Sequence, residues 1–325
     1  MPTLKEVADR AGVTVTTVSR MLNKPEKVHP STIKKIRQAM RELDYQPNEI
    51  ARSLSKKTSN FIGLIVPSAR NAFFAKVIES MERYSAACGY KLLLCVSNHE
   101  RKKEIDYFGM LRANKVAGVI IASHTQDIAE SVTLDAPIIS IDRVISPAIS
   151  AVCSDNFNGG RLAAQLLVKK GCRQIAYFNG GVTLKGMSAS QRQQGFEQEL
   201  RAMGREPIIQ THLEDRFISM KYQDIIDSFF ATHPGIDGAF CSNDILAAEM
   251  IRFACKKGIR VPEDLRVIGY DDIDLAELYL PSITTIRQAV EDISHYAVES
   301  IVHFGERPMP ATTIFPVKLI EREST

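Results

Sequence analysis

The sequence lacks long hydrophobic runs, and nothing in it approaches the ~18 consecutive apolar residues of a membrane-spanning helix. The residues after Met1 are Pro, Thr, Leu, Lys and Glu, which do not form the apolar core of a secretory signal peptide. We therefore expect a cytoplasmic protein with no membrane partner. Apolar residues make up 45% of the chain and charged residues 24%, which excludes an intrinsically disordered protein.

The chain also lacks the short motifs that carry most enzyme and metal chemistry. Its six cysteines include no C-x-x-C pair, and its seven histidines show no H-E-x-x-H spacing. There is no G-x-x-x-x-G-K-[ST] or G-x-S-x-G motif, and Gly180, Gly181 and Gly186 are too loosely spaced for a phosphate loop. These absences predict reduced core cysteines, no cofactor, no metal site and no catalytic residues.

Charge, by contrast, is unevenly distributed along the 325 residues. The formal net charge is only +3, but residues 1–60 hold 12 Lys and Arg against 6 Asp and Glu, while the rest hold 29 against 32. The length is about twice the ~150 residues of a typical domain. A small basic segment joined to a larger, slightly acidic one predicts a module that binds a polyanion and a second module with another role.

The start of the basic segment has the pattern of two short helices joined by a turn. Apolar residues recur at helical spacing over 4–11, and Thr3 and Glu6 have the spacing of a capping box. Gly12 interrupts this pattern, and Thr14 is a suitable N-cap for a second helix. Two helices joined by a glycine-containing turn within some twenty residues predict a helix-turn-helix.

The second helix has an apolar face and a polar face. The apolar side chains expected to form the core, from this helix and a third one that starts at Pro30, are Val18, Met21, Leu22, Ile33, Ile36, Met40 and Leu43. The opposite face presents Val15, Thr16, Thr17, Ser19 and Arg20. Because arginine can bridge O6 and N7 of guanine and methyl groups can meet thymine, this face predicts readout of a DNA major groove. Nearby lysines would contact phosphates or simply be solvated.

Residues 45–60 leave two interpretations open. Pro47 is expected to end the third helix, and Asn48 can cap a short new one with basic flanks. A helix this short is only marginally stable alone. The segment is either a linker with a frayed turn or a hinge helix that orders on DNA, with Leu54 wedged between base steps in the minor groove.

From residue 61 the pattern changes to short apolar runs that alternate with amphipathic stretches. The predicted strands are 61–66, 91–96, 118–122, 138–141, 151–154, 174–178, 238–241 and 266–269, and the predicted helices include 74–88, 161–169, 191–203 and 244–256. This alternation predicts parallel α/β sheet. A segment of this length would form two lobes rather than one.

Polar residues that follow these strands are candidate ligand contacts, because ligands of open α/β sheets bind beyond the carboxyl ends of the strands. They are Ser68, Asn71, Asp155, Asn156, Asn243, Asp244, Asp271 and Asp272, with Arg192 at the start of a helix. Carboxylates, amides and an arginine together can hold sugar hydroxyls. An aspartate in such a position is more often a helix N-cap than a ligand contact, and Asp155 and Asp244 are the most open to that alternative.

The motifs of the basic segment resemble those of the LacI/GalR family of bacterial transcription regulators. The resemblance rests on VADRAGVTVTTVSRMLN at 7–23, YQPN at 45–48 and ARSL at 51–54, and it extends to LIERES at 319–324. One departure is His29, where the family often has a serine cap before Pro30. Another is Ala289, where the family pattern often has proline.

This resemblance implies an all-α helix-turn-helix head and an α/β body with the two-lobed periplasmic-binding-protein-like fold, built from parallel sheets. The expected domains are a DNA-binding head (1–47), a hinge (48–60) and an effector-binding and dimerisation body (61–325). Within the body we expect an N-lobe of about 61–160 and 290–317 and a C-lobe of about 161–288 and 318–325. Three strands would cross between the lobes near 158–162, 286–290 and 316–320.

The resemblance also implies two sets of functional residues. The expected DNA contacts are Thr3, Leu4, Thr14, Val15, Thr16, Thr17, Ser19, Arg20, Asn23, His29, Asn48, Ala51, Arg52 and Leu54. The expected effector contacts are Asn71, Phe74, Asp155, Arg192, Phe217, Asn243 and Asp271. Phe217 would stack on the ligand or belong to the core, and Lys185 would face an acidic sugar or point at water.

We therefore expect a sequence-specific DNA-binding repressor of a carbohydrate-utilisation operon. A sugar, sugar acid or sugar phosphate would control its affinity for a pseudo-palindromic operator. We expect a homodimer, because the sequence ends without a heptad-bearing tail.

Four alternatives remain open. A regulator of the same family could bind DNA more tightly with a corepressor or a partner protein. A nucleobase sensor would need aromatic faces, which only Phe73, Phe74 and Phe217 offer. A sugar-binding transport receptor would share the body but have no DNA function, and a sugar-modifying enzyme would need a catalytic pair or a phosphate loop.

Overall fold

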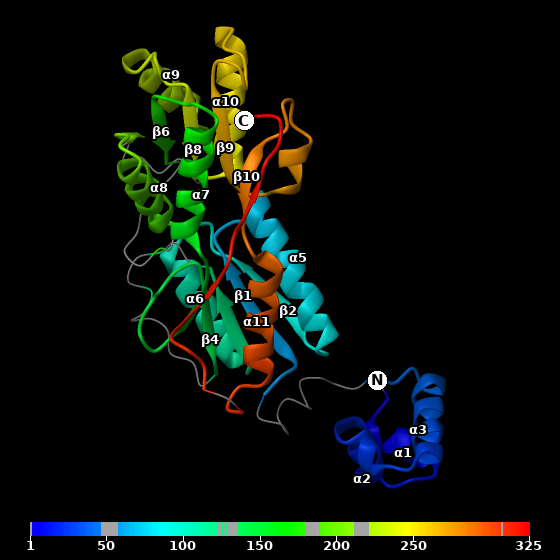
Figure 1. Cartoon of the computed structure of the whole chain (residues 1–325). Coiled ribbons are helices and arrows are strands. Elements are labelled where there is room, and N and C mark those ends of the chain that lie inside the picture. Colours follow the sequence, from blue (N-terminus) through cyan, green and yellow to red (C-terminus); the bar gives the residue numbers. More distant parts are fainter. Residues whose placement is uncertain are drawn as a thin grey trace. The chain divides into compact units, whose positions relative to one another are not determined.

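The computed structural model describes residues 2–46, 58–122, 125, 128, 136–179, 187, 189–210, 221–306 and 308–325. The chain forms two compact units, Met1–Ser59 and Asn60–Thr325, which we call the head and the body (Figure 1). The described part of the head consists of α1 (Leu4–Ala11), α2 (Val15–Asn23), η1 (Pro25–Lys27) and α3 (Pro30–Glu42).

Local capping fixes the helices of the head as the sequence predicts. The Thr3 hydroxyl accepts from the backbone N–H of Glu6, and the Glu6 carboxylate accepts from the backbone N–H of Thr3, so the capping box is present. Gly12 ends α1 at a φ of 65°, a left-handed conformation that glycine adopts without strain. Thr14 caps α2 by accepting from the backbone N–H of Thr17.

A small core holds the three helices together. Its buried residues are Val7, Ala8, Val18, Met21, Ile36 and Ala39, and Leu22, Ile33, Met40 and Leu43 pack against them partly buried. The predicted end of the third helix was wrong. This helix ends at Glu42 and Asp44 takes a φ of 48°, so the chain leaves the helix before Pro47.

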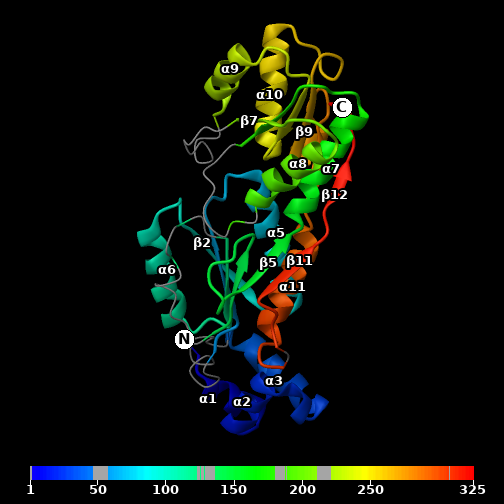
Figure 2. The same ribbon diagram turned by 60° about the vertical axis from the view of Figure 1, so that its left-hand side comes forward.

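The body contains two six-stranded sheets, one in each of its two lobes (Figures 1 and 2). The N-lobe sheet has the order β11-β5-β4-β3-β1-β2, and all of its described pairings are parallel. Its strands are β1 (Phe61–Val66), β2 (Lys91–Val96), β3 (Gly118–Ile121), β4 (Ile138–Ile141), β5 (Ser150–Ser154) and β11 (Thr312–Phe315). Helices α5 (Ala72–Ala87) and α11 (Val290–Val302) cover one face, and α6 (Arg101–Ala113) covers the other.

The C-lobe sheet has the order β12-β10-β9-β8-β6-β7. Its strands are β6 (Ile175–Phe178), β7 (Ile208–Gln210), β8 (Gly238–Cys241), β9 (Arg266–Asp271), β10 (Thr284–Arg287) and β12 (Lys318–Ile320). Edge strand β12 is antiparallel to β10, which departs from the all-parallel expectation. Helices α7 (Asn156–Lys169) and α8 (Ser190–Ala202) cover one face, α9 (Gln223–Thr232) and α10 (Asp244–Lys257) cover the other, and η3 (Asp274–Glu277) follows β9.

The chain crosses between the lobes three times, but not wholly as expected. Residues 158–162 do not form a crossing strand, because they belong to α7, which begins at Asn156 directly after β5. The other two crossings are the short segments 288–289 and 316–317. The eight strands predicted from the apolar runs are all present, with bounds that move by at most two residues.

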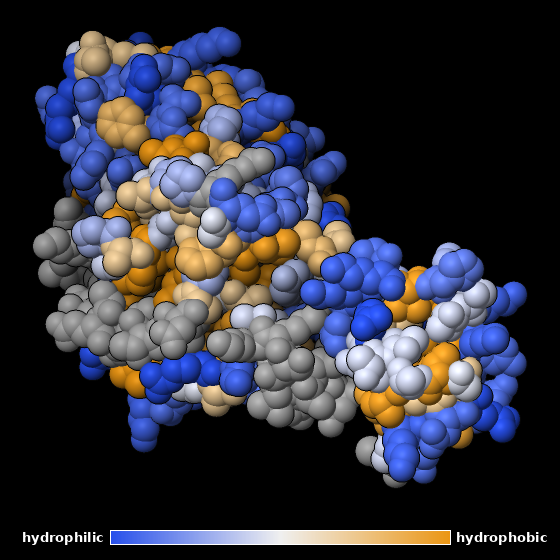
Figure 3. Space-filling view, turned by 90° about the horizontal axis from the view of Figure 1, so that it is seen from below, coloured by the Kyte–Doolittle hydropathy of each residue, from blue (hydrophilic) through white to orange (hydrophobic). Residues whose placement is uncertain are grey.

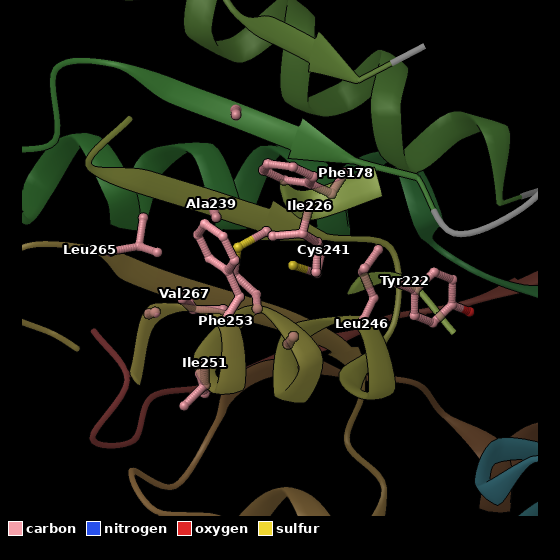
Figure 4. Close-up of a cluster of buried hydrophobic side chains, with 14 of the residues drawn as sticks. Phe178, Tyr222, Ile226, Ala239, Cys241, Leu246, Ile251, Phe253, Leu265 and Val267 are labelled. Carbon is pink, nitrogen blue, oxygen red and sulfur yellow. The ribbon is translucent and has the colours of Figure 1, made fainter. Parts of the chain in front are cut away.

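Aromatic and aliphatic side chains fill the space between the C-lobe sheet and its helices. Figure 4 shows one such cluster, in which Phe178 and Cys241 on neighbouring strands face Ile226 of α9 and Leu246 of α10. The cysteine prediction was only partly correct. Cys95, Cys153, Cys172 and Cys241 are buried, but Cys88 is partly exposed and Cys255 exposed, and all six are free thiols.

Helices α7 and α8 pack unusually close, because two glycines let their backbones meet. A Cβ added at Gly160 would overlap the carbonyl oxygen of Arg192, and one at Gly195 would overlap the carbonyl oxygen of Phe157. A side chain at either position would therefore force the helices apart. The two glycines thus set the position of α8 and of the side chains it carries.

The surface mixes polar side chains with apolar ones. Figure 3 shows apolar side chains gathered among hydrophilic ones on the visible face of the body. Within the described residues, no helix is long and apolar enough to cross a membrane. The same residues include no cluster of histidine, cysteine and carboxylate side chains that could hold a metal ion.

Candidate functional sites

Helix α2 turns its polar face outward. Val15 is 41% exposed, Thr16 and Arg20 are exposed, and Thr17 and Ser19 are partly buried. The buried residues of the helix lie on the opposite side. The face of α2 that is predicted to read DNA is therefore exposed and can contact the bases of a major groove.

The other expected DNA contacts of the head lie at helix ends. Thr3 and Thr14 are exposed caps, and Leu4 is partly buried against the head core. Asn23 donates weakly to the Ser19 hydroxyl at 3.4 Å. His29 caps α3 through Nδ1, which accepts from the backbone N–H of Ser31 at 3.4 Å, longer than an ordinary bond of this kind. The remaining expected contacts, Asn48, Ala51, Arg52 and Leu54, lie outside the described residues, and so does Phe217.

In the body, the most concentrated polar chemistry surrounds Arg192 of α8. Its guanidinium is buried and lies 3.6 Å from the centroid of the Tyr270 ring. Nε donates to the Asn156 side-chain oxygen at 2.5 Å, and Nη1 donates to the backbone carbonyl of Ser242 at 2.7 Å. The ring and these two bonds fix the guanidinium in one orientation.

Two carboxylates, one from each lobe, face this guanidinium. Asp142 directly follows β4 of the N-lobe, and its Oδ2 lies 3.8 Å from Nη2 of Arg192. Asp271 ends β9 of the C-lobe, and its Oδ1 lies 3.9 Å from Nη1. Asn156 donates to Asp142 at 3.0 Å and Gln288 donates to Asp271 at 2.7 Å. Arg192 therefore stands between acids of the two lobes without a short bond to either.

Burial disfavours the ionised form of both carboxyl groups. It raises the pKa of Asp142, against the lowering effect of Arg192, and it raises the pKa of Asp271 to about 7. A single guanidinium cannot compensate two desolvated anions. The cluster therefore holds a proton at mildly acidic pH.

Because the folded body binds this proton more tightly than the unfolded chain does, we expect the body to lose stability as the pH rises. Between pH 3.8 and about 7 the folded chain keeps a proton on Asp271 that the unfolded chain has released. The stabilisation that this proton gives the folded body is therefore complete below pH 3.8. It decreases between pH 3.8 and 7 and is lost above pH 7. We expect the free energy of unfolding of Asp271→Asn to exceed that of the wild type by ~2 kcal/mol more at pH 8 than at pH 5. Denaturant titrations of both proteins test this, and parallel pH profiles would contradict it.

The backbone that carries Asp271 is strained. Asp271 has a φ of 106° and Asp272 a φ of 53°, conformations that cost non-glycine residues free energy. The Asp272 carboxylate accepts from Arg287 at 2.5 Å and pairs with Arg322 at 2.8 Å. Buried Asp244 accepts from the backbone N–H of Ile273 at 2.8 Å. These contacts hold the turn of residues 271–273 in place.

Asp244 is not a helix cap, contrary to the alternative considered for it, because Asn243 caps α10 by accepting from the N–H of Leu246. Burial and nearby Asp271 raise the pKa of Asp244 well above its usual value. Its side chain fixes the turn of residues 271–273 and does not cap the helix.

Four of the expected effector contacts have structural roles. Asn71, Asp155 and Asn243 cap α5, α7 and α10, each by accepting from a backbone N–H two or three residues later. Phe74 is 3% exposed and belongs to the N-lobe core. Of the described candidate ligand contacts, the structure brings together Arg192, Asp271 and Asn156.

Sequence reasoning missed three members of this cluster, namely Asp142, Tyr270 and Gln288. Asp142 directly follows a correctly predicted strand, so the strand-end rule that selected Asp271 also applies to it. Tyr270 and Gln288 gave no signal, because neither a strand tyrosine nor a crossing glutamine differs from its neighbours in pattern.

The sequence matches two described protein families. Residues 59–323 match "Periplasmic binding proteins and sugar binding domain of LacI family", and residues 3–48 match "Bacterial regulatory proteins, lacI family". A sucrose operon repressor of Streptococcus mutans serotype c is 38% identical over 322 residues, which cover 99% of this chain and 98% of that protein.

Two solved structures are similar to the chain. A periplasmic binding protein/LacI transcriptional regulator from Alkaliphilus metalliredigens QYMF, complexed with D-xylulofuranose, has a TM-score of 0.72 and 33% identity, and the match covers 82% of this chain and 99% of that one. A Lac repressor dimer bound to operator and the anti-inducer ONPF has a TM-score of 0.85 and 26% identity, with 99% and 98% covered.

Proposed function

The chain belongs to the LacI family of bacterial regulatory proteins, and on this premise we propose that it represses a carbohydrate-utilisation operon under the control of a small neutral sugar. The observation that carries the proposal is the buried cluster in which Arg192 stands between carboxylates of the two lobes. In the same chain, the exposed face of α2 would bind the operator DNA.

The composition of the cluster favours a sugar over a nucleobase. Carboxylate and amide oxygens together with a guanidinium match hydroxyl groups, which both donate and accept. The ring of Tyr270 is fully buried beneath Arg192 and Phe74 lies in the core, so neither ring offers an open face for a nucleobase. The sucrose operon repressor and the regulator complexed with D-xylulofuranose agree with this choice.

The charge of the cluster favours a neutral sugar over a sugar acid or sugar phosphate. Asp142 and Asp271 contribute two carboxylates against the one cation of Arg192, whose Nε and Nη1 already donate to Asn156 and Ser242. An anionic ligand would add a third negative group to a desolvated site, which is costly.

We further propose that the regulator works as a homodimer in the cytoplasm, on an operator with two half-sites. The similar Lac repressor is a dimer on its operator, and a two-fold protein fits a pseudo-palindrome. Leu278 is 74% exposed and Leu280 90% exposed, an apolar surface that association can cover. An effector that prefers one arrangement of the lobes shifts the population of that arrangement and thereby the DNA affinity.

The test combines ligand screening with DNA binding by the full-length protein. Thermal shift against sucrose, D-xylulose, D-ribose, gluconate, glucose 6-phosphate and adenine should give its largest shift with a neutral sugar. Operators are then selected from a randomised pseudo-palindromic library, and their affinity is measured with and without that sugar. Weaker binding identifies an inducer and stronger binding a corepressor. The proposal fails if adenine or a charged sugar is preferred, or if no ligand alters operator affinity.

A further inference from the structure

Lys76 lies on α5 of the N-lobe, and its side chain contacts the C-lobe turn that carries Asp271. Its ammonium group donates to the backbone carbonyl of Asp272 at 3.2 Å and lies 3.3 Å from a carboxylate oxygen of Asp274. Figure 1 shows α5 beginning beside the C-lobe strands, at the end of the helix where this contact is made. The contact thus joins the two lobes next to the Arg192 cluster without belonging to it.

The two contacts of Lys76 differ in how much they stabilise the structure. Asp274 is 89% exposed, and an exposed ion pair contributes little because water and salt screen it. The bond to the Asp272 carbonyl is partly buried and has a charged donor, so it is the stronger of the two. Lys76 therefore acts chiefly on the backbone of the strained turn.

The turn is otherwise held from the C-lobe side. Arg287 and Arg322 bind the Asp272 carboxylate, and Asp244 binds the backbone of Ile273. Arg287 directly precedes the crossing segment, whose Gln288 donates to Asp271. One connected set of contacts therefore runs from the candidate ligand carboxylate to a crossing between the lobes, and Lys76 adds the N-lobe to it.

We propose that Lys76 is a positioning residue that couples occupancy of the Arg192 cluster to the arrangement of the lobes, an inference that rests on the proposed function. When the lobes move apart, Lys76 separates from both partners, so its bonds favour the closed arrangement. A sugar bound between Asp142 and Asp271 favours the same arrangement, and the two effects reinforce each other by linkage.

Replacing Lys76 with methionine keeps the length of the side chain and removes its charge. We expect Lys76→Met to weaken binding of the best neutral sugar of the panel above 5- to 20-fold by calorimetry, although Lys76 does not touch the ligand cluster. Because the substitution shifts the lobe equilibrium even without ligand, operator affinity of the sugar-free protein should change in the direction opposite to the change that sugar causes. Lys76→Arg keeps the cation and should restore both values to within threefold.

Arg83→Met is the matched control, because Arg83 is a cation on the same helix whose partner, Glu291, lies within the N-lobe. It should leave sugar and operator affinity unchanged. The inference is overturned if Lys76→Met matches the wild type in both measurements, or if Arg83→Met changes them equally. If no panel compound binds the wild type, the proposed function fails separately, and the sugar-free operator affinity of Lys76→Met still decides the role of Lys76.

Discussion

Asp271→Asn should bind the effector ~100-fold more weakly while its body becomes more stable. The carboxylate can accept two charge-assisted hydrogen bonds from sugar hydroxyls, and a site that leaves such groups unpaired discriminates strongly. The same carboxylate is costly to keep ionised, because burial raises its pKa to about 7. Removing the charge should therefore raise the free energy of unfolding at pH 8 by about 4 kcal/mol, roughly half of which develops between pH 5 and pH 8.

The substitution should not disturb the surroundings of the turn. An asparagine oxygen can still accept from Gln288 Nε2, now 2.7 Å from the carboxylate, and asparagine tolerates positive φ better than most residues. Asp142 still lies 3.8 Å from Arg192, so the guanidinium keeps a carboxyl group beside it. A loss of binding can then be attributed to the carboxylate itself.

Calorimetry with the sugar and denaturant titration at pH 8 measure the two effects. The control is Asp264→Asn, which removes a carboxylate that Arg260 pairs on the C-lobe surface, away from the cluster. It should leave sugar affinity unchanged. If Asp271→Asn is destabilised, its carboxylate is structural, and if affinity is kept, the ligand lies elsewhere.

The alternation of apolar runs was enough to predict a body of α/β sheet in two lobes, whereas the particular two-lobed fold was implied by the family resemblance. Buried parallel strands are short and almost wholly apolar, so runs such as 61–66 and 138–141 mark their own ends. Helix starts were less clear. Helix α7 begins five residues before its predicted start, because Asn156 and Asn158 give no apolar signal although Asp155 caps the helix. The first crossing, which the family resemblance placed at 158–162, was also wrong, because those residues belong to α7.

The candidate site could be predicted only in part, because strand-end polar residues serve two purposes. A side chain beyond a strand also precedes the next helix, where Asn71, Asp155 and Asn243 satisfy free backbone N–H groups as caps. Sequence alone cannot separate caps from ligand contacts, since both need short polar side chains. Arg192 and Asp271 differ because neither caps a helix and both are buried, which is a property of the packed structure.

Arg20→Ala should cost ~1–3 kcal/mol of binding free energy for each operator half-site and almost nothing on unrelated DNA. Arg20 is exposed on α2, and in the described residues its guanidinium pairs with no carboxylate. It is therefore free to bond a guanine edge. The head should stay folded, because Val18 and Met21 on the other side of the helix make its core contacts. A dimer carries two copies of Arg20, so the loss should be close to doubled on a symmetric operator.

The measurement is fluorescence anisotropy of full-length protein on the selected operator and on a scrambled duplex, at two or more salt concentrations. Lys34→Ala on α3 is the matched control, because Lys34 is an exposed cation that is not on the reading face. If Lys34 binds a phosphate, its removal should weaken binding to both duplexes alike and reduce the salt dependence. Equal losses of affinity on both duplexes for Arg20→Ala would mean that Arg20 holds only phosphate. Sequence readout would then fall to Val15 and Thr16, whose methyl groups and hydroxyl discriminate bases less strongly than a bidentate arginine does.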